Sequence, residues 1–255
     1  MNGIPLEPLT RLEGVGTPTY VYDLDAMAAE ARAIEFAFEG ASHLVAYAVK
    51  ANSAGPVIRA LAAEGCGADV VSGPELVLAN RCGIPVDKII YSGVAKSDDE
   101  LDLALGLDGK GIRAINVESV EEIQRLAARA RAKNQVARVT LRINPGVDED
   151  VIDTHKHITT GHDDAKFGIP LSTLNAAVEV LLANAAHVKL VGVAAHAGSQ
   201  LTAIESYLSS ARKVFEIARS LRPKFALELV DTGGGFGIDY GKGCPVEPAD
   251  FIREV

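Results

Sequence analysis

The chain has 255 residues, of which 48% are hydrophobic and 23% charged, so it can bury a large core as one large α/β domain or two ordinary ones. Its formal net charge of −9 at pH 7, with no cluster of lysine and arginine, excludes a nucleic-acid-binding surface. It has no signal-peptide pattern, no apolar stretch of bilayer length and only three cysteines without metal-ligand spacing, so we expect a cytoplasmic protein with reduced thiols, no metal and no membrane association.

The hydrophobic pattern predicts strands and helices in alternation along most of the chain. Strands are expected over 17–22, 44–49, 68–72, 88–92, 113–117, 138–144, 189–196 and 226–231. Helices are expected over 24–38, 56–64, 74–82, 98–107, 119–133, 171–184 and 204–221, and a last one begins at 248. Asp23 is the expected cap of the first helix, and Ser119 with Glu122 three residues later predicts a capping box. A long irregular insertion is expected over 145–168.

This alternation favours a parallel sheet, because parallel strands are joined by crossover helices and are apolar on both faces. From residue 44 onward the sequence contains seven strand–helix units, whereas a (β/α)8 barrel needs eight. We therefore expect an α/β fold, a TIM-type (β/α)8 barrel over 23–255 that is incomplete at its C-terminal end, preceded by an N-terminal strand segment over 1–22. A seven-stranded parallel sheet with two open edges and a doubly wound open sheet are the alternatives.

The strand at 44–49 is followed by a lysine, Lys50, which is the first candidate for chemistry. With a period of two, Lys50 shares a face with Ala46 and Ala48, whose small side chains leave room beside it. A buried ammonium group is costly unless it is paired or chemically transformed. Imine formation with an aldehyde cofactor or a carbonyl substrate is such a transformation. A lysine that ends an edge strand and points into water is the alternative.

Chemistry in parallel barrels takes place at the C-terminal ends of the strands, so polar residues there are candidate site residues. They lie at or just beyond the strand ends: Asp69, Ser72 and Glu75 at the second barrel strand, Arg142 and Asn144 at the fifth, His196 and Ser199 at the sixth, and Asp231 with Gly233, Gly234 and Gly235 at the seventh. The glycines allow successive backbone N–H groups to point at one phosphate, and the Ser199 hydroxyl adds a donor. A flexible turn is the alternative interpretation of the glycines.

Together these residues favour pyridoxal 5′-phosphate as the cofactor, since the lysine amine can hold its aldehyde and the glycine N–H groups its phosphate. In this interpretation His196 lies flat against the cofactor ring, and Arg142 faces the ring oxygen or a substrate carboxylate. Asp69 orients His196 or the lysine. A structural histidine, and an ordinary first-turn helix acid in the case of Glu75, are the alternatives.

Several segments resemble motifs of the alanine-racemase-like, fold-type-III pyridoxal phosphate enzymes. The cofactor-lysine motif corresponds to Tyr47-Ala48-Val49-Lys50-Ala51-Asn52, the second-strand motif to 65–72 with Glu75, the ring-stacking motif to 196–200 and the phosphate motif to 233–235. Within this group, the segments 144–148, 154–161 and 166–169 most resemble the diaminopimelate decarboxylase family. The resemblance extends from about Thr17 to Tyr240. Ala194 and Ala197 depart from the family pattern, which often has a histidine and a larger residue there.

The resemblance implies decarboxylation of meso-2,6-diaminopimelate to L-lysine and CO₂, with Lys50 and His196 as catalytic residues. It also implies a homodimer with a shared active site. In the family, four further functional residues lie downstream of this chain: an acid for the ring nitrogen, a phosphate-binding arginine, a cysteine proton donor from the partner subunit, and a tyrosine. Several of them belong to a C-terminal β domain, with which residues 1–22 would pair. We therefore expect this chain alone to be inactive and prone to aggregation, because its seventh strand would have an open edge. The alternatives are an ornithine or arginine decarboxylase, a racemase, and a decarboxylase-like protein that binds a partner and no cofactor.

Overall fold

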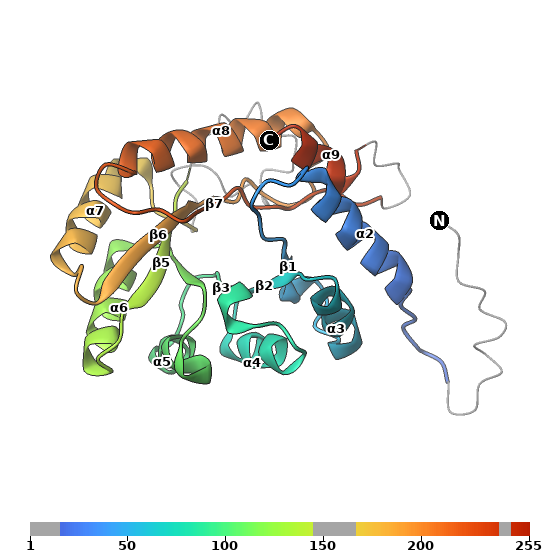
Figure 1. Cartoon of the computed structure of the whole chain (residues 1–255), viewed down its shortest axis with the longest axis horizontal. Helices are drawn as coiled ribbons and strands as arrows, with labels where there is room; N and C mark the ends of the chain where they lie inside the picture. The colour runs from blue at the N-terminus through green and yellow to red at the C-terminus, as the bar shows by residue number, and fades with distance from the viewer. Residues whose placement is uncertain (1–15, 145–166, 240–245) are drawn as a thin grey trace.

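The computed structural model describes residues 16–144, 167–239 and 246–255. Seven parallel strands form one sheet in the order β1-β2-β3-β4-β5-β6-β7, so each strand pairs with the next along the chain. The strands are β1 (Ala46–Ala48), β2 (Gly67–Val70), β3 (Ile89–Tyr91), β4 (Ala114–Val117), β5 (Ala137–Arg142), β6 (Val188–Ala194) and β7 (Leu229–Asp231). The sheet curls with helices on its outer side (Figure 1). This confirms the expected TIM-type barrel in partial form and excludes a doubly wound sheet, in which the strand order reverses.

The helices begin and end close to the predicted positions. They are α2 (Leu24–Ala37), α3 (Gly55–Ala63), α4 (Gly73–Arg81), α5 (Asp98–Gly106), α6 (Val120–Ala132), α7 (Leu174–Ala183), α8 (Ile204–Leu221) and α9 (Pro248–Arg253). Short 3₁₀ helices are η1 (Val49–Ala51), η2 (Val86–Lys88), η3 (Leu107–Gly109) and η4 (Leu171–Thr173). The last helix, α9, packs against α2 and α8, so the first and last described helices lie side by side (Figure 1).

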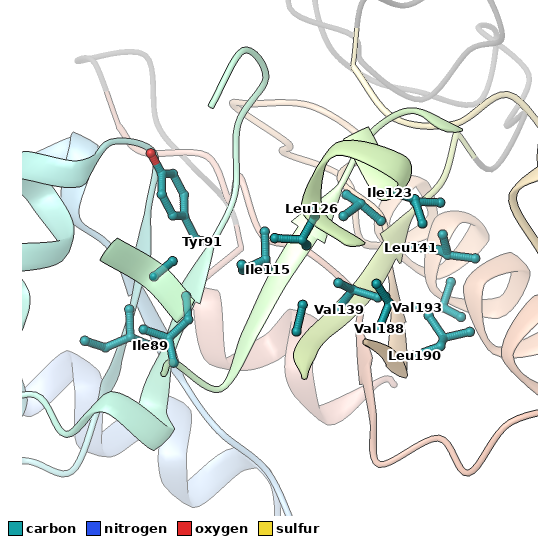
Figure 2. Packing of buried hydrophobic residues seen from close by; sticks show 14 of the residues in the cluster. Ile89, Tyr91, Ile115, Ile123, Leu126, Val139, Leu141, Val188, Leu190 and Val193 are labelled. Atoms are coloured by element: carbon teal, nitrogen blue, oxygen red, sulfur yellow. The ribbon is translucent and has the colours of Figure 1, made fainter. Parts of the chain in front are cut away.

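The main core lies between the outer face of the sheet and the helices. β3 and β4 are buried along their whole length, as expected of strands that are covered on both faces. Figure 2 shows Ile115 of β4 and Val139 of β5 near Ile123 and Leu126 of α6, and all four are at most 2% exposed. Because strand side chains alternate between faces, the residues between them, such as Asn116, point to the inner face of the curled sheet.

Three of the helices begin at a serine whose side-chain oxygen accepts a backbone N–H, which stabilises the first turn. The predicted capping box at Ser119 is only half correct. Ser119 accepts from the Glu122 N–H, but Glu122 Oε2 accepts the N–H of Glu118 at 2.8 Å rather than that of Ser119. A complete capping box forms instead at Ser97 and Glu100, on α5.

Several predicted strands are shorter in the structure, such as 44–49, which is reduced to β1, and one is absent from the described residues. The segment 17–22 forms no strand among the described residues, where no other strand lies beside it, and Tyr20 is 87% exposed; its expected pairing with a C-terminal β domain stays a prediction. The strand expected over 226–231 is shortened to β7. Residues 1–15 and most of the predicted insertion, 145–166, lie outside the described residues. Among the helices that the structure describes, none combines the length and apolarity needed to cross a membrane.

Candidate active site

Lys50 lies at the C-terminal edge of the sheet, in the 3₁₀ helix η1 that directly follows β1. The expectation that it is buried is wrong: Lys50 is exposed, because the chain leaves the sheet after Ala48. Its ammonium group is nevertheless near enough to His196 and Asp69 to lower the pKa of each. The lysine is thus accessible from outside while its charge acts on two other candidate residues.

The turn that carries Lys50 is fixed by its own motif. The Tyr47 hydroxyl donates to the Asn52 carbonyl at 3.0 Å, and Asn52 Oδ1 accepts the N–H of Ala54 at 3.0 Å. These two bonds satisfy backbone groups that the sheet no longer pairs. The tyrosine and asparagine of the motif therefore hold the lysine in place, with no chemical role of their own required.

His196 follows β6 by two residues and is a largely buried imidazole. Burial, together with the nearby charges of Arg142 and Lys50, which act in the same direction, lowers its pKa from 6.5 to about 4. The ring is therefore neutral at pH 7. A neutral, flat ring suits packing against an aromatic cofactor, which is the role predicted for His196.

The three glycines after β7 form a turn that packs directly on the loop after β6. A Cβ on Gly235 would lie 1.9 Å from the Gly198 carbonyl oxygen, and one on Gly233 would lie 3.3 Å from His196 Nδ1. Both residues have positive φ, +77° at Gly233 and +85° at Gly235, which other residues rarely adopt. A Cβ on Gly234, in contrast, would have nothing within 4 Å. The turn is thus rigidly packed on one side and open at its centre, as an anion-binding turn needs to be.

Ser199 is exposed in the loop between His196 and Leu201. That loop is held against the glycine turn, because the Leu201 N–H donates to the Gly235 carbonyl at 2.9 Å and the Gly237 N–H donates to the Leu201 carbonyl at 2.7 Å. The structure therefore brings the predicted hydroxyl donor and the predicted anion-binding turn onto neighbouring loops.

Two acids, Asp69 and Asp231, lie close enough for the charge of one to raise the pKa of the other. Burial is the main cause that raises the pKa of Asp69 from 3.8 to about 6, and a hydrogen bond from Ser92 acts in the opposite direction. Burial also raises the pKa of Asp231, whose Oδ1 accepts the N–H of Gly233 at 2.9 Å. Asp231 therefore fixes the first residue of the glycine turn.

A row of buried polar side chains on the inner face connects these acids, and the sequence did not predict it. Asn116 Nδ2 donates to Ser92 Oγ at 2.9 Å, and the Thr140 hydroxyl donates to Asn116 Oδ1. Ser92 lies close enough to Asp69, and Asn116 close enough to Asp231, to lower the pKa of the neighbouring carboxyl group. The available signal was Asn116, the one polar residue of β4, and Thr140, which alternates with Arg138 and Arg142 along β5.

Arg142 ends β5 and forms a buried ion pair with Glu118. The sequence predicted Arg142 as a site residue but did not predict Glu118. Arg142 Nη1 donates to Glu118 Oε1 at 3.0 Å, and the guanidinium carbon of Arg142 lies 5.1 Å from the centre of the Phe167 ring. Glu118 Oε2 accepts the Gly168 N–H at 3.1 Å. Glu118 directly follows β4, so the same strand-end rule that identified Arg142 would have found it.

Glu75, another acid near the site, has a structural partner. Glu75 Oε2 accepts the Val71 N–H at 2.9 Å, which supports the interpretation of Glu75 as a first-turn helix acid. Among the described residues, no group of three or more histidine, cysteine, aspartate or glutamate side chains could hold a metal ion.

The residues that the structure brings together fit a cofactor with an aldehyde and a phosphate. Lys50 presents an accessible amine, and Gly234 opens the centre of a turn of backbone N–H groups. Asp69 Oδ1 is buried and has no hydrogen-bond partner among the described residues, so a further polar group would complete the site.

Comparison with known proteins agrees with this fit. The sequence profile of pyridoxal-dependent decarboxylases, for their pyridoxal-binding domain, matches residues 24–254. Diaminopimelate decarboxylase of Zymomonas mobilis is 41% identical over 238 residues, which cover 92% of this chain and 55% of that protein. The Pseudomonas aeruginosa enzyme of the same name is 38% identical over 244 residues, covering 95% of this chain and 57% of that protein. The chain thus spans just over half the length of the curated relatives it matches.

Solved structures give the same picture. The crystal structure of Helicobacter pylori diaminopimelate decarboxylase complexed with L-lysine matches with a TM-score of 0.88 and 34% identity, covering 98% of this chain and 61% of that one. The arginine decarboxylase of Paramecium bursaria Chlorella virus, at 18% identity and a TM-score of 0.70, shares the fold.

Proposed function

Because the chain belongs to the family of pyridoxal-dependent decarboxylases, we propose that it forms the cofactor-binding part of an enzyme that converts meso-2,6-diaminopimelate to L-lysine and CO₂. The observation that carries the proposal is the packing of the glycine turn against His196, within reach of the charge of Lys50. The relatives at 38–41% identity that are named diaminopimelate decarboxylase support the choice of substrate.

Most of the predicted residues have a direct role in this proposal. The Lys50 amine binds the cofactor aldehyde, the N–H groups around Gly234 with the Ser199 hydroxyl bind its phosphate, and the neutral His196 ring covers one face of its ring. Arg142 binds the ring oxygen or a substrate carboxylate. Pyridoxal phosphate, when bound, supplies the electron sink for the electron pair that remains when CO₂ leaves. The His196 ring is neutral at pH 7, so it covers the cofactor ring without adding a positive charge there.

We further propose a cytoplasmic homodimer with a shared active site. The cytoplasmic location is supported by Cys66 and Cys82, which are free, buried thiols and suit a reducing compartment. The dimer is supported by Lys50 and Ser199, which are exposed at the open side of the sheet, where a second subunit would cover them. The segment 1–22 is proposed to pair with a C-terminal β domain, and the exposed Tyr20 on its extended part supports that.

The test is cofactor binding followed by product analysis. Purified full-length gene product is mixed with pyridoxal phosphate, and Lys50→Ala is compared with Lys110→Ala, an exposed lysine before β4 at the opposite edge of the sheet. We expect a visible absorbance band that Lys50→Ala abolishes and Lys110→Ala retains, with lysine released only from diaminopimelate. A colourless wild-type protein refutes the cofactor assignment. Product from ornithine, arginine or racemisation alone refutes the substrate assignment.

A further inference from the structure

Four charged side chains form a buried row behind the candidate site: Lys96, Glu122, Glu118 and Arg142. Their side chains are 1%, 10%, 3% and 11% exposed, respectively. The row begins on the segment before α5, crosses the start of α6 and the end of β4, and reaches the site at the end of β5. Two positive and two negative charges make it neutral as a whole.

Lys96 is held by three acceptors. Its Nζ donates to the Gly93 carbonyl at 2.6 Å, to the Asn116 carbonyl at 2.8 Å and to Glu122 Oε1 at 2.8 Å. All three protons of the ammonium group therefore have partners. Because Asn116 lies in β4, two residues before Glu118, Lys96 fixes the end of β4 as well as the Glu122 carboxylate.

Glu122 passes this constraint to Glu118. Its second oxygen, Oε2, accepts the backbone N–H of Glu118 at 2.8 Å. Both oxygens of Glu118 are in turn used, since Oε1 accepts from Arg142 at 3.0 Å and Oε2 accepts from the Gly168 N–H at 3.1 Å. Backbone and side chain of Glu118 are thus both fixed, and the guanidinium of Arg142 is held between Glu118 and the Phe167 ring.

Stability alone does not explain this row. Buried ion pairs often contribute no more to stability than apolar residues of the same volume, because each charge loses its hydration. A planar guanidinium, however, recognises a carboxylate or phenolate only when its plane is correctly oriented. A fixed orientation is what the row provides.

We propose that Glu118 is a positioning residue for Arg142, and that the Lys96–Glu122 pair positions Glu118. This inference rests on the proposed function, in which Arg142 binds the anionic oxygen of the cofactor ring or a substrate carboxylate. Losing the Glu118 carboxylate lets the guanidinium rotate. A misplacement of about 1 Å costs on the order of 100-fold in rate, so we expect Glu118→Gln to lower kcat/KM by about 10- to 100-fold.

The test is a double-mutant cycle with Arg142→Lys in the full-length gene product. If Glu118 acts through Arg142, the double variant loses no more activity than Arg142→Lys alone. Glu100→Gln is the matched control, because both oxygens of Glu100 are likewise used, by the backbone N–H groups of Gly73 and Ser97, but without contact to Arg142. Its effect should multiply with that of Arg142→Lys. Multiplicative losses for Glu118→Gln would overturn the proposal.

Two further measurements separate positioning from simple destabilisation. In Glu118→Gln that is still folded by thermal melting, we expect either a raised KM for substrate or a shifted pH titration of the cofactor absorbance. In the cofactor-free protein, ¹⁵N NMR should show slow rotation of the Arg142 guanidinium that becomes fast in Glu118→Gln and in the Lys96→Met/Glu122→Met pair. Unchanged rotation overturns the inference even if pyridoxal phosphate binds. A colourless wild type with freed rotation overturns only the proposed function.

Discussion

His196 and Asp69 should give the free energy of unfolding opposite dependences on pH, and this can be measured without cofactor. Burial lowers the pKa of His196 from 6.5 to about 4, so between these values the unfolded chain binds more protons than the folded one. Stability from the neutral histidine is complete above pH 6.5 and is lost as the pH falls. Burial raises the pKa of Asp69 from 3.8 to about 6, so there the folded chain binds more protons and stability falls as the pH rises.

The magnitudes follow from these shifts. Relative to high pH, His196 should reduce the free energy of unfolding by about 1.4 kcal/mol at pH 5.5 and about 2.5 kcal/mol at pH 4.5. Relative to low pH, Asp69 should reduce it by about 1 kcal/mol at pH 4.5 and about 3 kcal/mol at pH 7. In the wild-type protein the two effects largely cancel across this range, so the unmodified pH profile conceals both.

Single substitutions separate the two effects. Urea unfolding of cofactor-free wild type, His196→Gln and Asp69→Asn is measured between pH 4.5 and 7, and each variant is compared with wild type at the same pH so that other titrating groups cancel. His196→Gln should gain about 2.5 kcal/mol relative to wild type as the pH falls from 7 to 4.5. Asp69→Asn should gain about 2 kcal/mol relative to wild type as the pH rises over the same range. A variant whose profile stays parallel to that of wild type would refute the burial of that group.

Two further predictions test the packing of the site. Gly235→Ala should lower the free energy of unfolding by more than about 1 kcal/mol, because residue 235 has a positive φ and its Cβ would contact a carbonyl oxygen, and it should abolish pyridoxal phosphate binding. Gly234→Ala, the control, should keep the wild-type melting temperature. Similar melting temperatures of the two variants would contradict the glycine-turn geometry. Thr140→Val should lower the free energy of unfolding in urea at pH 7 by about 1–3 kcal/mol, because it leaves Asn116 Oδ1 without its donor. Thr173→Val, at an exposed hydroxyl, should change it by no more than about 0.5 kcal/mol. Equal losses would argue against the buried polar contacts of Thr140 and Asn116.

The sequence was sufficient to predict the fold and the residues that gather at one edge of the sheet. Strand–helix alternation implies parallel strands, and parallel strands end at one edge, so Lys50, Arg142, His196 and the glycines could be grouped without coordinates. The conformation of Lys50 could not be predicted. An apolar run shows where a strand can form, but whether its last residues stay in the sheet depends on the neighbouring strand, and β2 pairs with β1 only as far as Ala48.

Partner choice over long sequence distances was the other limit. Ser97 with Glu100 and Ser119 with Glu122 have the same capping-box spacing, yet only the first pair forms the complete box. Glu122 is redirected by Lys96, a buried ammonium 26 residues earlier that needs a carboxylate. The spacing of Ser119 and Glu122 does not show that a distant buried lysine needs the Glu122 carboxylate as its partner. The sequence pattern therefore predicted a helix cap where the structure has a network of charged side chains.

The two faces of the curled sheet explain why polar residues persist inside it. The outer face, with Ile89 and Val139 fully buried against the helices, supplies apolar burial that stabilises the fold (Figure 2). The inner face carries Asp69 and Asp231, whose raised pKa values mean that each costs stability when ionised at pH 7. Apolar residues there would be more stable, and Asn116 would then be unnecessary as a connection between the acids. Because the inner residues cost stability and converge on the glycine turn and the lysine, their presence is better explained by binding than by folding.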